Sequence, residues 1–261
     1  MKDNVTAPAP ARTDGRIALI TGASRGIGAA TAVLFGQRGY RVAVHHDNNP
    51  AEAGHIATRI SDLGGEALVV RADLTQAQDV ADLVDTVSQH WGPIEVLVHD
   101  GPRSHVRTSF ADLHLDRLEQ DVAAELRAAF LVTKAVAPAM IARNCGRLVY
   151  LSTEHSRHPQ FKRIVEGTAK AALNQFVRYI AQELALHGIT ANLVAPGNVA
   201  GVDTHGAGWI DAELWVLGAA NTPARVVLPG DVARTVAFFA SEDCVTTTGH
   251  YAPVNTGLAL H

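Results

Sequence analysis

One short segment early in the chain has the residue types of a phosphate-binding loop. Residues 21–28 read Thr-Gly-Ala-Ser-Arg-Gly-Ile-Gly, and they stand between an apolar run and a stretch of helical spacing. Gly22, Gly26 and Gly28 allow a tight turn and a close approach of the backbone to a ligand. The exposed N–H groups and the positive end of the helix would then receive a pyrophosphate. The segment therefore predicts a dinucleotide site.

The elements that must position this loop follow a repeating pattern of a short apolar run, a turn and a helical stretch. Apolar runs such as residues 96–98 indicate strands buried on both faces, and right-handed crossovers place helices on both sides of one sheet. The expected fold is α/β, a doubly wound parallel sheet of Rossmann type in a single domain. The expected strands are Ile17–Thr21, Arg41–His45, Ala67–Ala72, Ile94–His99, Gly146–Ser152, Thr190–Ala195 and Tyr251–Val254. The expected helices are Gly26–Arg38, Ala51–Leu63, Ala77–His90, Leu115–Arg143, Gly167–His187 and Pro229–Ala240.

Two parts of the chain depart from this pattern. Residues 1–15 are rich in Pro, Ala and polar residues, which predicts a flexible N-terminal arm ahead of a domain at 16–261. Residues 201–229 contain Trp209 and Trp215 among glycines and follow a strand end, where α/β folds bind ligands. This segment is expected to be a substrate lid. The alternative is a packed excursion whose tryptophans cover the core or a subunit contact.

Composition narrows the classes of function. The 261 residues include 22 basic and 26 acidic side chains and are 47% hydrophobic, which is typical of a well-buried globular domain. Without clustered cations the chain is not expected to bind nucleic acid or an anionic membrane, and no apolar run is long enough to span one. The distant Cys145 and Cys244 predict neither a disulfide framework nor a metal site, and a cytoplasmic location is expected.

Several motifs, spread from about Arg16 to Leu260, resemble the short-chain dehydrogenase/reductase family. The likeness implies an oxidoreductase that uses a nicotinamide cofactor and acts on a small molecule. It also implies that Asp73 meets the adenine ring and that Asn192 supports the strand below the site. The motifs are Thr21-Gly22-x-x-x-Gly26-x-Gly28, Ala-Asp73-Leu-Thr, Phe130-Leu-Val-Thr, Ala-Lys170-Ala-Ala-Leu, Asn192 with Ala195-Pro196-Gly197, and Thr248-Gly-His-x-x-Pro-Val-Asn.

The resemblance also implies how the cofactor is chosen. Selection of NAD uses a carboxylate at the end of the second strand, where this chain has His46, followed by Asp47. Arg25 in the glycine loop is a candidate partner for a 2′-phosphate, so NADP(H) is the expected cofactor. A shift of one residue would instead place Asp47 at the selecting position. The expected cofactor-binding residues are Gly22, Ser24, Arg25, Gly26, Ile27, Gly28, His46, Asp73, Leu74, Lys170, Pro196, Gly197 and Val199.

The catalytic pattern that the resemblance implies is altered. The family uses an asparagine, a serine, a tyrosine and a lysine. Alignment on the strand that ends near Ser152 places Thr153 at the serine position, Glu166 at the tyrosine position and Lys170 at the lysine position; alignment through Phe130 places Glu125 at the asparagine position. The expected catalytic residues are Glu166, Lys170, Thr153 and Glu125.

The chemistry of Glu166 depends on its surroundings. Positions i and i+4 share a helix face, so Glu166 and Lys170 can pair, which would keep Glu166 ionised. Burial or a neighbouring Glu125 would act in the opposite direction and favour the neutral acid. The family's usual alcohol/ketone interconversion therefore does not transfer directly to this chain.

Three interpretations follow from this altered pattern. In the first, NADPH reduces an imine, an iminium ion or another activated C=X group, because a carboxylate stabilises an iminium better than a phenol does. A likeness of strand two to the pteridine-reductase branch, which reduces C=N bonds, favours this interpretation. In the second, Glu166, Glu125 and Thr153 catalyse redox-neutral isomerisation, dehydration or cyclisation by proton transfer, with His155 or His158 as candidate additional groups. In the third, the chain binds nucleotide or a partner without catalysis, and Glu166–Lys170 is a simple salt bridge.

The two long helices predict an oligomer. Leu115–Arg143 and Gly167–His187 are apolar over more than one stripe, although a helix on the surface of a monomer needs only one buried face. The family's usual arrangement is a four-helix interface made by these helices. A homodimer or homotetramer is therefore expected.

Overall fold

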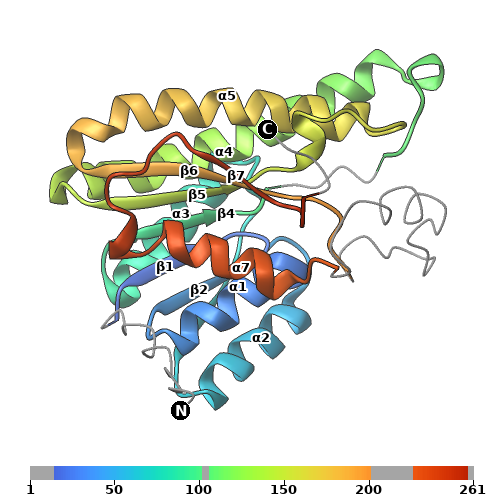
Figure 1. The fold of residues 1–261 in the computed structure, drawn as a ribbon. Helices are drawn as coiled ribbons and strands as arrows, with labels where there is room; N and C mark the ends of the chain where they lie inside the picture. Colours follow the sequence, from blue (N-terminus) through green and yellow to red (C-terminus); the bar gives the residue numbers. More distant parts are fainter. Residues whose placement is uncertain (1–14, 102–105, 201–225, 258–261) are drawn as a thin grey trace, which may run out of the picture.

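Seven parallel strands form one sheet in the order β3-β2-β1-β4-β5-β6-β7 (Figure 1). The computed structural model describes residues 15–101, 106–200 and 226–257. The expected doubly wound parallel fold is confirmed. The strands are β1 (Ile17–Ile20), β2 (Arg41–His46), β3 (Glu66–Arg71), β4 (Val96–His99), β5 (Gly146–Leu151), β6 (Ile189–Pro196) and β7 (Tyr251–Val254).

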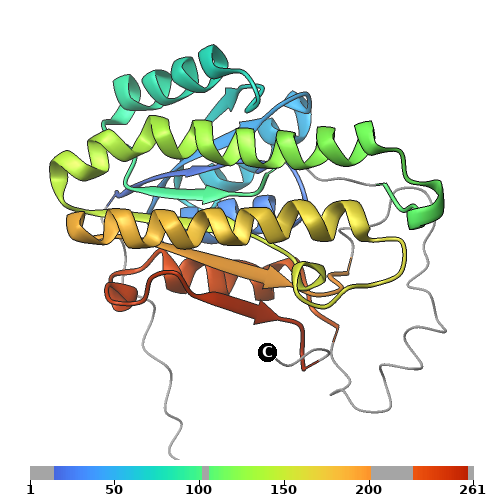
Figure 2. The same cartoon turned by 90° about the horizontal axis from the view of Figure 1, so that it is seen from above.

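Helices cover both faces of the sheet. Helices α3, α4 and α5 lie on one face, and α1, α2 and α7 lie on the other (Figures 1 and 2). Helices α4 and α5 run side by side along the length of their face (Figure 2). The helices are α1 (Gly26–Gln37), α2 (Pro50–Asp62), α3 (Ala77–Trp91), α4 (Leu115–Arg143), α5 (Ile164–Leu184) and α7 (Pro229–Phe239).

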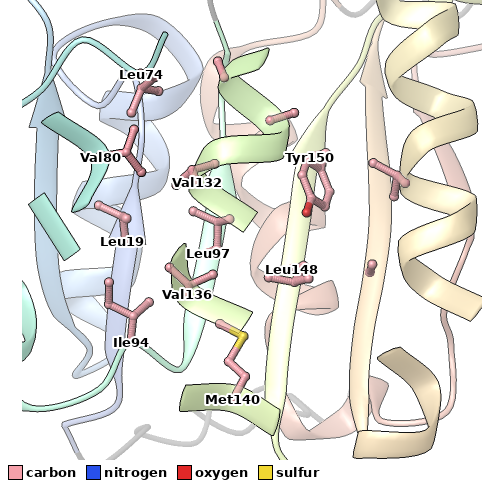
Figure 3. Packing of buried hydrophobic residues seen from close by; sticks show 14 of the residues in the cluster. Leu19, Leu74, Val80, Ile94, Leu97, Val132, Val136, Met140, Leu148 and Tyr150 are labelled. Carbon is pink, nitrogen blue, oxygen red and sulfur yellow. The ribbon is translucent and has the colours of Figure 1, made fainter. Parts of the chain in front are cut away.

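The core is divided by the sheet because successive side chains on a strand point to opposite faces. Leu19 and Leu97 point toward α3, α4 and α5 and pack with Leu148 in one apolar cluster (Figure 3). Ile20 and Val98 belong to a second cluster under α1, α2 and α7. All four residues of β1 are buried, as the continuous apolar run predicts.

Helix α5 begins three residues earlier than the sequence predicts, at Ile164 instead of Gly167. Gly167, the predicted first residue, lies within the first turns of the helix. The glycine at position 167 instead allows α5 to pass close to residue 155, because a Cβ atom on Gly167 would stand 2.8 Å from the carbonyl oxygen of His155. The earlier start places Glu166 in the first turn of the helix.

Some predictions lie outside the described residues. These are nearly all of the arm at 1–15 and most of the expected lid at 201–229, since the description resumes at residue 226 and α7 begins at Pro229. Among the helices that are described, none is long and apolar enough to cross a membrane.

Candidate functional site

The glycine loop between β1 and α1 has a backbone that suits a phosphate group. Gly22 has a φ of 61°, in the left-handed region that favours glycine. A Cβ atom on Gly28 would stand 2.3 Å from the carbonyl oxygen of Gly22. Helix α1 has no acidic residue in its first turn, and its N-cap residue Arg25 forms no side-chain capping bond. The loop thus offers the close backbone approach that a pyrophosphate requires, with Gly22, Gly26 and Gly28 lining it.

The side chain of His45 is hydrogen-bonded to this loop. The Gly22 N–H donates to His45 Nδ1 at 3.1 Å, so the ring proton sits on Nε2, which donates to the carbonyl of Ala72 at 3.0 Å. Burial lowers the pKa of His45 to about 4. The neutral ring therefore connects the glycine loop, β2 and the end of β3. Sequence reasoning missed this role, for which the only signal was a polar residue at the end of an apolar strand.

The end of β2 presents one buried histidine and one arginine. His46 is the last residue of β2, one residue beyond the predicted end of this strand, and its Nδ1 is buried without a hydrogen-bond partner among the described residues. Arg71 stands beside His46 in the β2–β3 register and donates from Nε to the carbonyl of Asp47 at 3.1 Å. Arg25 is exposed at the start of α1. Arg71 is therefore a second cation near this edge of the sheet, and sequence reasoning did not single it out.

Asp73 is held by its own turn. Its Oδ1 accepts hydrogen bonds from the Thr75 N–H at 2.8 Å and the Thr75 hydroxyl at 2.7 Å, and these bonds lower the pKa of the carboxyl. The neighbouring Leu74 is buried. The turn therefore presents an ionised carboxylate and an apolar side chain just beyond β3, which is compatible with the expected contact to an adenine ring.

Lys170 and Glu125 form a buried ion pair between α5 and α4. Lys170 Nζ donates to Glu125 Oε1 at 2.8 Å and to the carbonyl of Leu151 at 2.9 Å, and both side chains are buried. Burial raises the pKa of Glu125, against the attraction of the Lys170 charge. The two residues were each expected in the site, but their mutual contact was not.

Glu166 takes a different partner from the one that helix spacing suggests. Its Oε2 accepts from Arg163 Nη1 at 2.8 Å, and its side chain is 24% exposed. The expected Glu166–Lys170 pair does not form in the described structure, because Lys170 turns inward to Glu125 and Leu151. Arg163 is the N-cap residue of α5, and its side chain reaches forward to Glu166 in the first turn. The cation that neutralises Glu166 is therefore Arg163, which sequence reasoning missed.

Thr153 follows β5 at the edge where the other site residues lie. Its hydroxyl accepts from the His155 N–H at 3.4 Å and caps the short helix η2 (Glu154–Ser156). Its carbonyl accepts from the hydroxyls of Tyr251 at 2.9 Å and Ser156 at 2.6 Å. These bonds fix the backbone of Thr153, and its hydroxyl proton is directed to no acceptor in the described residues.

Glu154 is a buried carboxyl that the sequence did not reveal. Its Oε2 accepts from Asn255 Nδ2 at 3.3 Å, and a Cβ atom on Gly197 would stand 2.8 Å from the same oxygen. Burial raises the pKa of Glu154, while the charge of His158 acts in the opposite direction. Glu154 thereby connects η2 to the turn after Pro196, where β6 ends, and to the end of β7.

The remaining expected residues also lie at this edge of the sheet. Ser24 and Ile27 are buried in the glycine loop and first turn of α1. The Gly197 N–H donates to the carbonyl of Val254 at 3.1 Å, and Val199 pairs with Val227 in an isolated bridge. His155 is buried in η2, and His158 follows that short helix. The carboxyl ends of parallel strands meet here, which explains why residues so distant in sequence share one site.

A family model described as short chain dehydrogenase matches residues 16–208. A short-chain type dehydrogenase/reductase from Picea abies is 31% identical and covers 93% of this chain and 92% of its own length. A 3-oxoacyl-[acyl-carrier-protein] reductase from Synechocystis is 30% identical and covers 94% and 97%. Versicolorin reductase from Emericella nidulans is 31% identical and covers 94% and 96%.

Solved structures show the same architecture. A protein from Sinorhizobium meliloti 1021, described as a short-chain alcohol dehydrogenase, superposes with a TM-score of 0.87 at 25% identity and covers 95% of this chain and 97% of its own. An NADH-dependent reductase of alginate metabolism superposes with a TM-score of 0.83 at 22% identity and covers 95% and 98%. The second likeness concerns the fold alone.

Proposed function

The chain belongs to the short-chain dehydrogenase/reductase family, whose members use NAD(P)(H), and from this premise we propose that it is an NADP(H)-dependent reductase of an imine, an iminium ion or another activated C=X group. The supporting observation is the Glu125–Lys170 ion pair, which stands with Glu166 where the family pattern has asparagine, lysine and tyrosine. The substrate is a small molecule.

The ion pair changes what Lys170 can do. In the family pattern, the lysine lowers the pKa of a tyrosine phenol that protonates a ketone oxygen. Here a buried carboxylate lies 2.8 Å from the ammonium and offsets its charge, and the aligned position holds Glu166 instead of a phenol. A ketone bound here would therefore lack the phenol that usually protonates its oxygen. It would also lack a lysine whose positive charge is not already offset.

A cationic acceptor suits this arrangement better. Glu166 is partly exposed and is held by Arg163 from one side, so one face of its carboxylate remains available to a ligand. A positive charge about 4 Å from an unpaired carboxylate near a protein surface gains up to ~4 kcal/mol, and the charge of Arg163 reduces this gain at Glu166. NADPH, when bound, supplies the hydride. A neutral imine first takes up one proton from solvent to form the iminium ion. Addition of hydride to the iminium carbon then yields a neutral amine and requires no proton from the enzyme in that step.

The preference for NADP(H) is supported by the cations near the end of β2. Arg71, the last residue of β3, lies in register with His46 and contacts the backbone of Asp47, so it lies beside the strand end where an NAD-selecting carboxylate would act. Arg25 adds a second, exposed cation on the glycine loop. Two arginines would complement a 2′-phosphate, because guanidinium groups bind phosphate in a bidentate manner.

The cofactor proposal is tested without a substrate. Nucleotide-free protein is titrated with NADPH and with NADH while nicotinamide emission and tryptophan quenching are followed. We expect tighter binding of NADPH, and Arg71→Ala should reduce this preference roughly tenfold or more. Arg59→Ala, an exposed arginine on α2, is the matched control. Equal affinity for both nucleotides in the unaltered protein would contradict the preference.

The catalytic proposal is tested by comparing Glu166→Gln with Glu183→Gln, an exposed glutamate on the same helix. With NADPH and a panel of cyclic imines, Glu166→Gln should lower kcat/KM by roughly 10²-fold or more, whereas Glu183→Gln should leave it unchanged. Cofactor binding should remain in both variants. Unchanged turnover in Glu166→Gln would remove this carboxylate from the mechanism.

The panel of acceptors separates the remaining interpretations. Faster NADPH oxidation with imines than with matched ketones supports the proposal, and the reverse order overturns it. Conversion of a substrate without NADPH oxidation would instead favour redox-neutral proton transfer. Nucleotide binding without turnover of any acceptor would favour a non-catalytic role.

A further inference from the structure

A buried ring nitrogen beside the Glu125–Lys170 pair lacks a partner. His99 is the last residue of β4 and is fully buried, and no donor or acceptor among the described residues reaches its Nε2. An unsatisfied buried polar atom is uncommon in folded proteins and usually marks an ordered water or a ligand. The surroundings of His99 therefore determine what it binds.

Hydrogen bonds on the other side of the ring indicate which form His99 takes. The Thr21 hydroxyl donates to the carbonyl of Asp100 at 3.1 Å and accepts from the Asp100 N–H at 3.0 Å. His99 Nδ1 lies 3.2 Å from the same hydroxyl oxygen. Because the hydroxyl proton is already donated, Nδ1 carries the ring proton and donates to Thr21. Nε2 is then a bare acceptor.

Glu125 points at the same place from α4. A Cβ atom on Gly101 would stand 2.9 Å from His99 Nε2 and 3.0 Å from Glu125 Oε1, so both atoms face one side of this glycine. Glu125 Oε1 already accepts from Lys170 and has a second lone pair. Two acceptors cannot bond directly to each other, whereas one water molecule can donate a hydrogen to each.

We propose that an internal water binds between His99 Nε2 and Glu125 Oε1 beside Gly101. It completes a chain of hydrogen bonds from Lys170 through Glu125, the water and His99 to Thr21, at the start of the glycine loop. His99 is thus a positioning residue for the Lys170–Glu125 pair. This water site needs neither a bound cofactor nor a substrate and does not depend on the proposed function.

The direct test is a crystal structure of the unaltered protein at a resolution that shows ordered water. We expect one water oxygen within hydrogen-bonding distance of both His99 Nε2 and Glu125 Oε1. A well-ordered site in which the two side chains share no water overturns the proposal. This measurement requires no variant and therefore holds even if a substituted protein fails to fold.

Two glycine variants provide the matched comparison. Gly101→Ala places a methyl group against both acceptors and should displace the water. Gly54→Ala adds the same methyl group on α2, where no atom lies within 4 Å, and should leave the water in place. Persistence of the water on both acceptors in Gly101→Ala would contradict the site as described.

The ring nitrogens give a second readout that a merely structural role for Gly101 would not move. In ¹⁵N-histidine-labelled protein, His99 Nε2 should have the chemical shift of an unprotonated, hydrogen-bonded nitrogen. The shift should move toward that of a free lone pair in Gly101→Ala and stay constant in Gly54→Ala. A protonated Nε2 in the unaltered protein would overturn the proposal as stated, in which Nε2 accepts a hydrogen from the water, because a protonated ring nitrogen can only donate.

Discussion

Burial of His45 contributes to the dependence of stability on pH. Its pKa falls from 6.5 to about 4 on folding, so the unfolded chain takes up a proton at a higher pH than the folded chain does. The contribution of His45 to the free energy of unfolding is complete above pH 6.5 and declines as the pH falls toward 4. Its size is about 3 kcal/mol, at ~1.4 kcal/mol for each pH unit.

We expect His45→Ala to lack this dependence. The loss of unfolding free energy caused by the substitution should be larger at pH 7 than at pH 4 by about 3 kcal/mol. Urea unfolding of both proteins across this range measures the difference. His55→Ala, on α2 and away from the glycine loop, is the control. An equal loss at both pH values would show that the proton uptake of His45 is not coupled to folding.

The Glu125–Lys170 pair predicts a strong interaction between two substitutions. Lys170→Met leaves a buried carboxyl without its cation and should lower the free energy of unfolding by about 3 kcal/mol or more. Lys170→Met combined with Glu125→Leu removes both charges and should cost less than the single change. Denaturant unfolding of both single variants and the double variant gives the coupling energy. If the losses of unfolding free energy are additive, the two residues have no interaction energy with each other.

At the scale of elements, the glycine loop and α1 act as one unit. Gly28→Ala would force a methyl group toward the carbonyl oxygen of Gly22 and push the helix away from the loop. We expect NADPH affinity to fall by about 100-fold or more, with a smaller change in melting temperature. Fluorescence titration measures the affinity, and Gly54→Ala is the control. Undiminished binding would place the nucleotide away from this loop.

The elements themselves were largely predictable. Alternation between apolar runs and helical spacing located all seven strands, and β7 and α4 have the predicted bounds. The start of α5 was predicted three residues late, because Gly167 reflects a close approach to His155 and not a helix end. Such an approach joins residues from two different elements, and no pattern within one segment reveals it.

The structure brings residues of the predicted site to one edge of the sheet, but their pairings were not predictable from the sequence. Motif spacing located Lys170 and Glu125, but their contact joins two helices across the sheet face. Arg163 and Glu154 were missed because an arginine before a helix and a glutamate after a strand are common on surfaces. The amide that donates to Glu154 belongs to Asn255, 101 residues further on, and the sequence does not relate the two residues.

At the scale of the whole molecule, the face formed by α4 and α5 is the expected interface. Phe130 on α4 is 52% exposed and Tyr179 on α5 is 58% exposed, although large aromatic side chains are usually buried. We expect light scattering to give at least twice the chain mass of 27.6 kDa. Phe130→Ser with Tyr179→Ser should shift the population toward monomer.

A control for the interface lies on the opposite side of the sheet. Leu63, at the end of α2, is 48% exposed, and Leu63→Ser should leave the assembly unchanged. A monomeric mass for the unaltered protein at micromolar concentration would contradict the expected homodimer or homotetramer. Dissociation by Leu63→Ser alone would place the interface on the α1, α2 and α7 face.

The Glu125–Lys170 contact also restricts the routes by which this chain could have diverged. Either charge alone would be buried without compensation, so the two positions cannot drift independently. Asparagine at position 125 would leave the charge of Lys170 buried without its carboxylate, so a change at one position favours a change at the other. We expect the two positions to covary among relatives of this sequence.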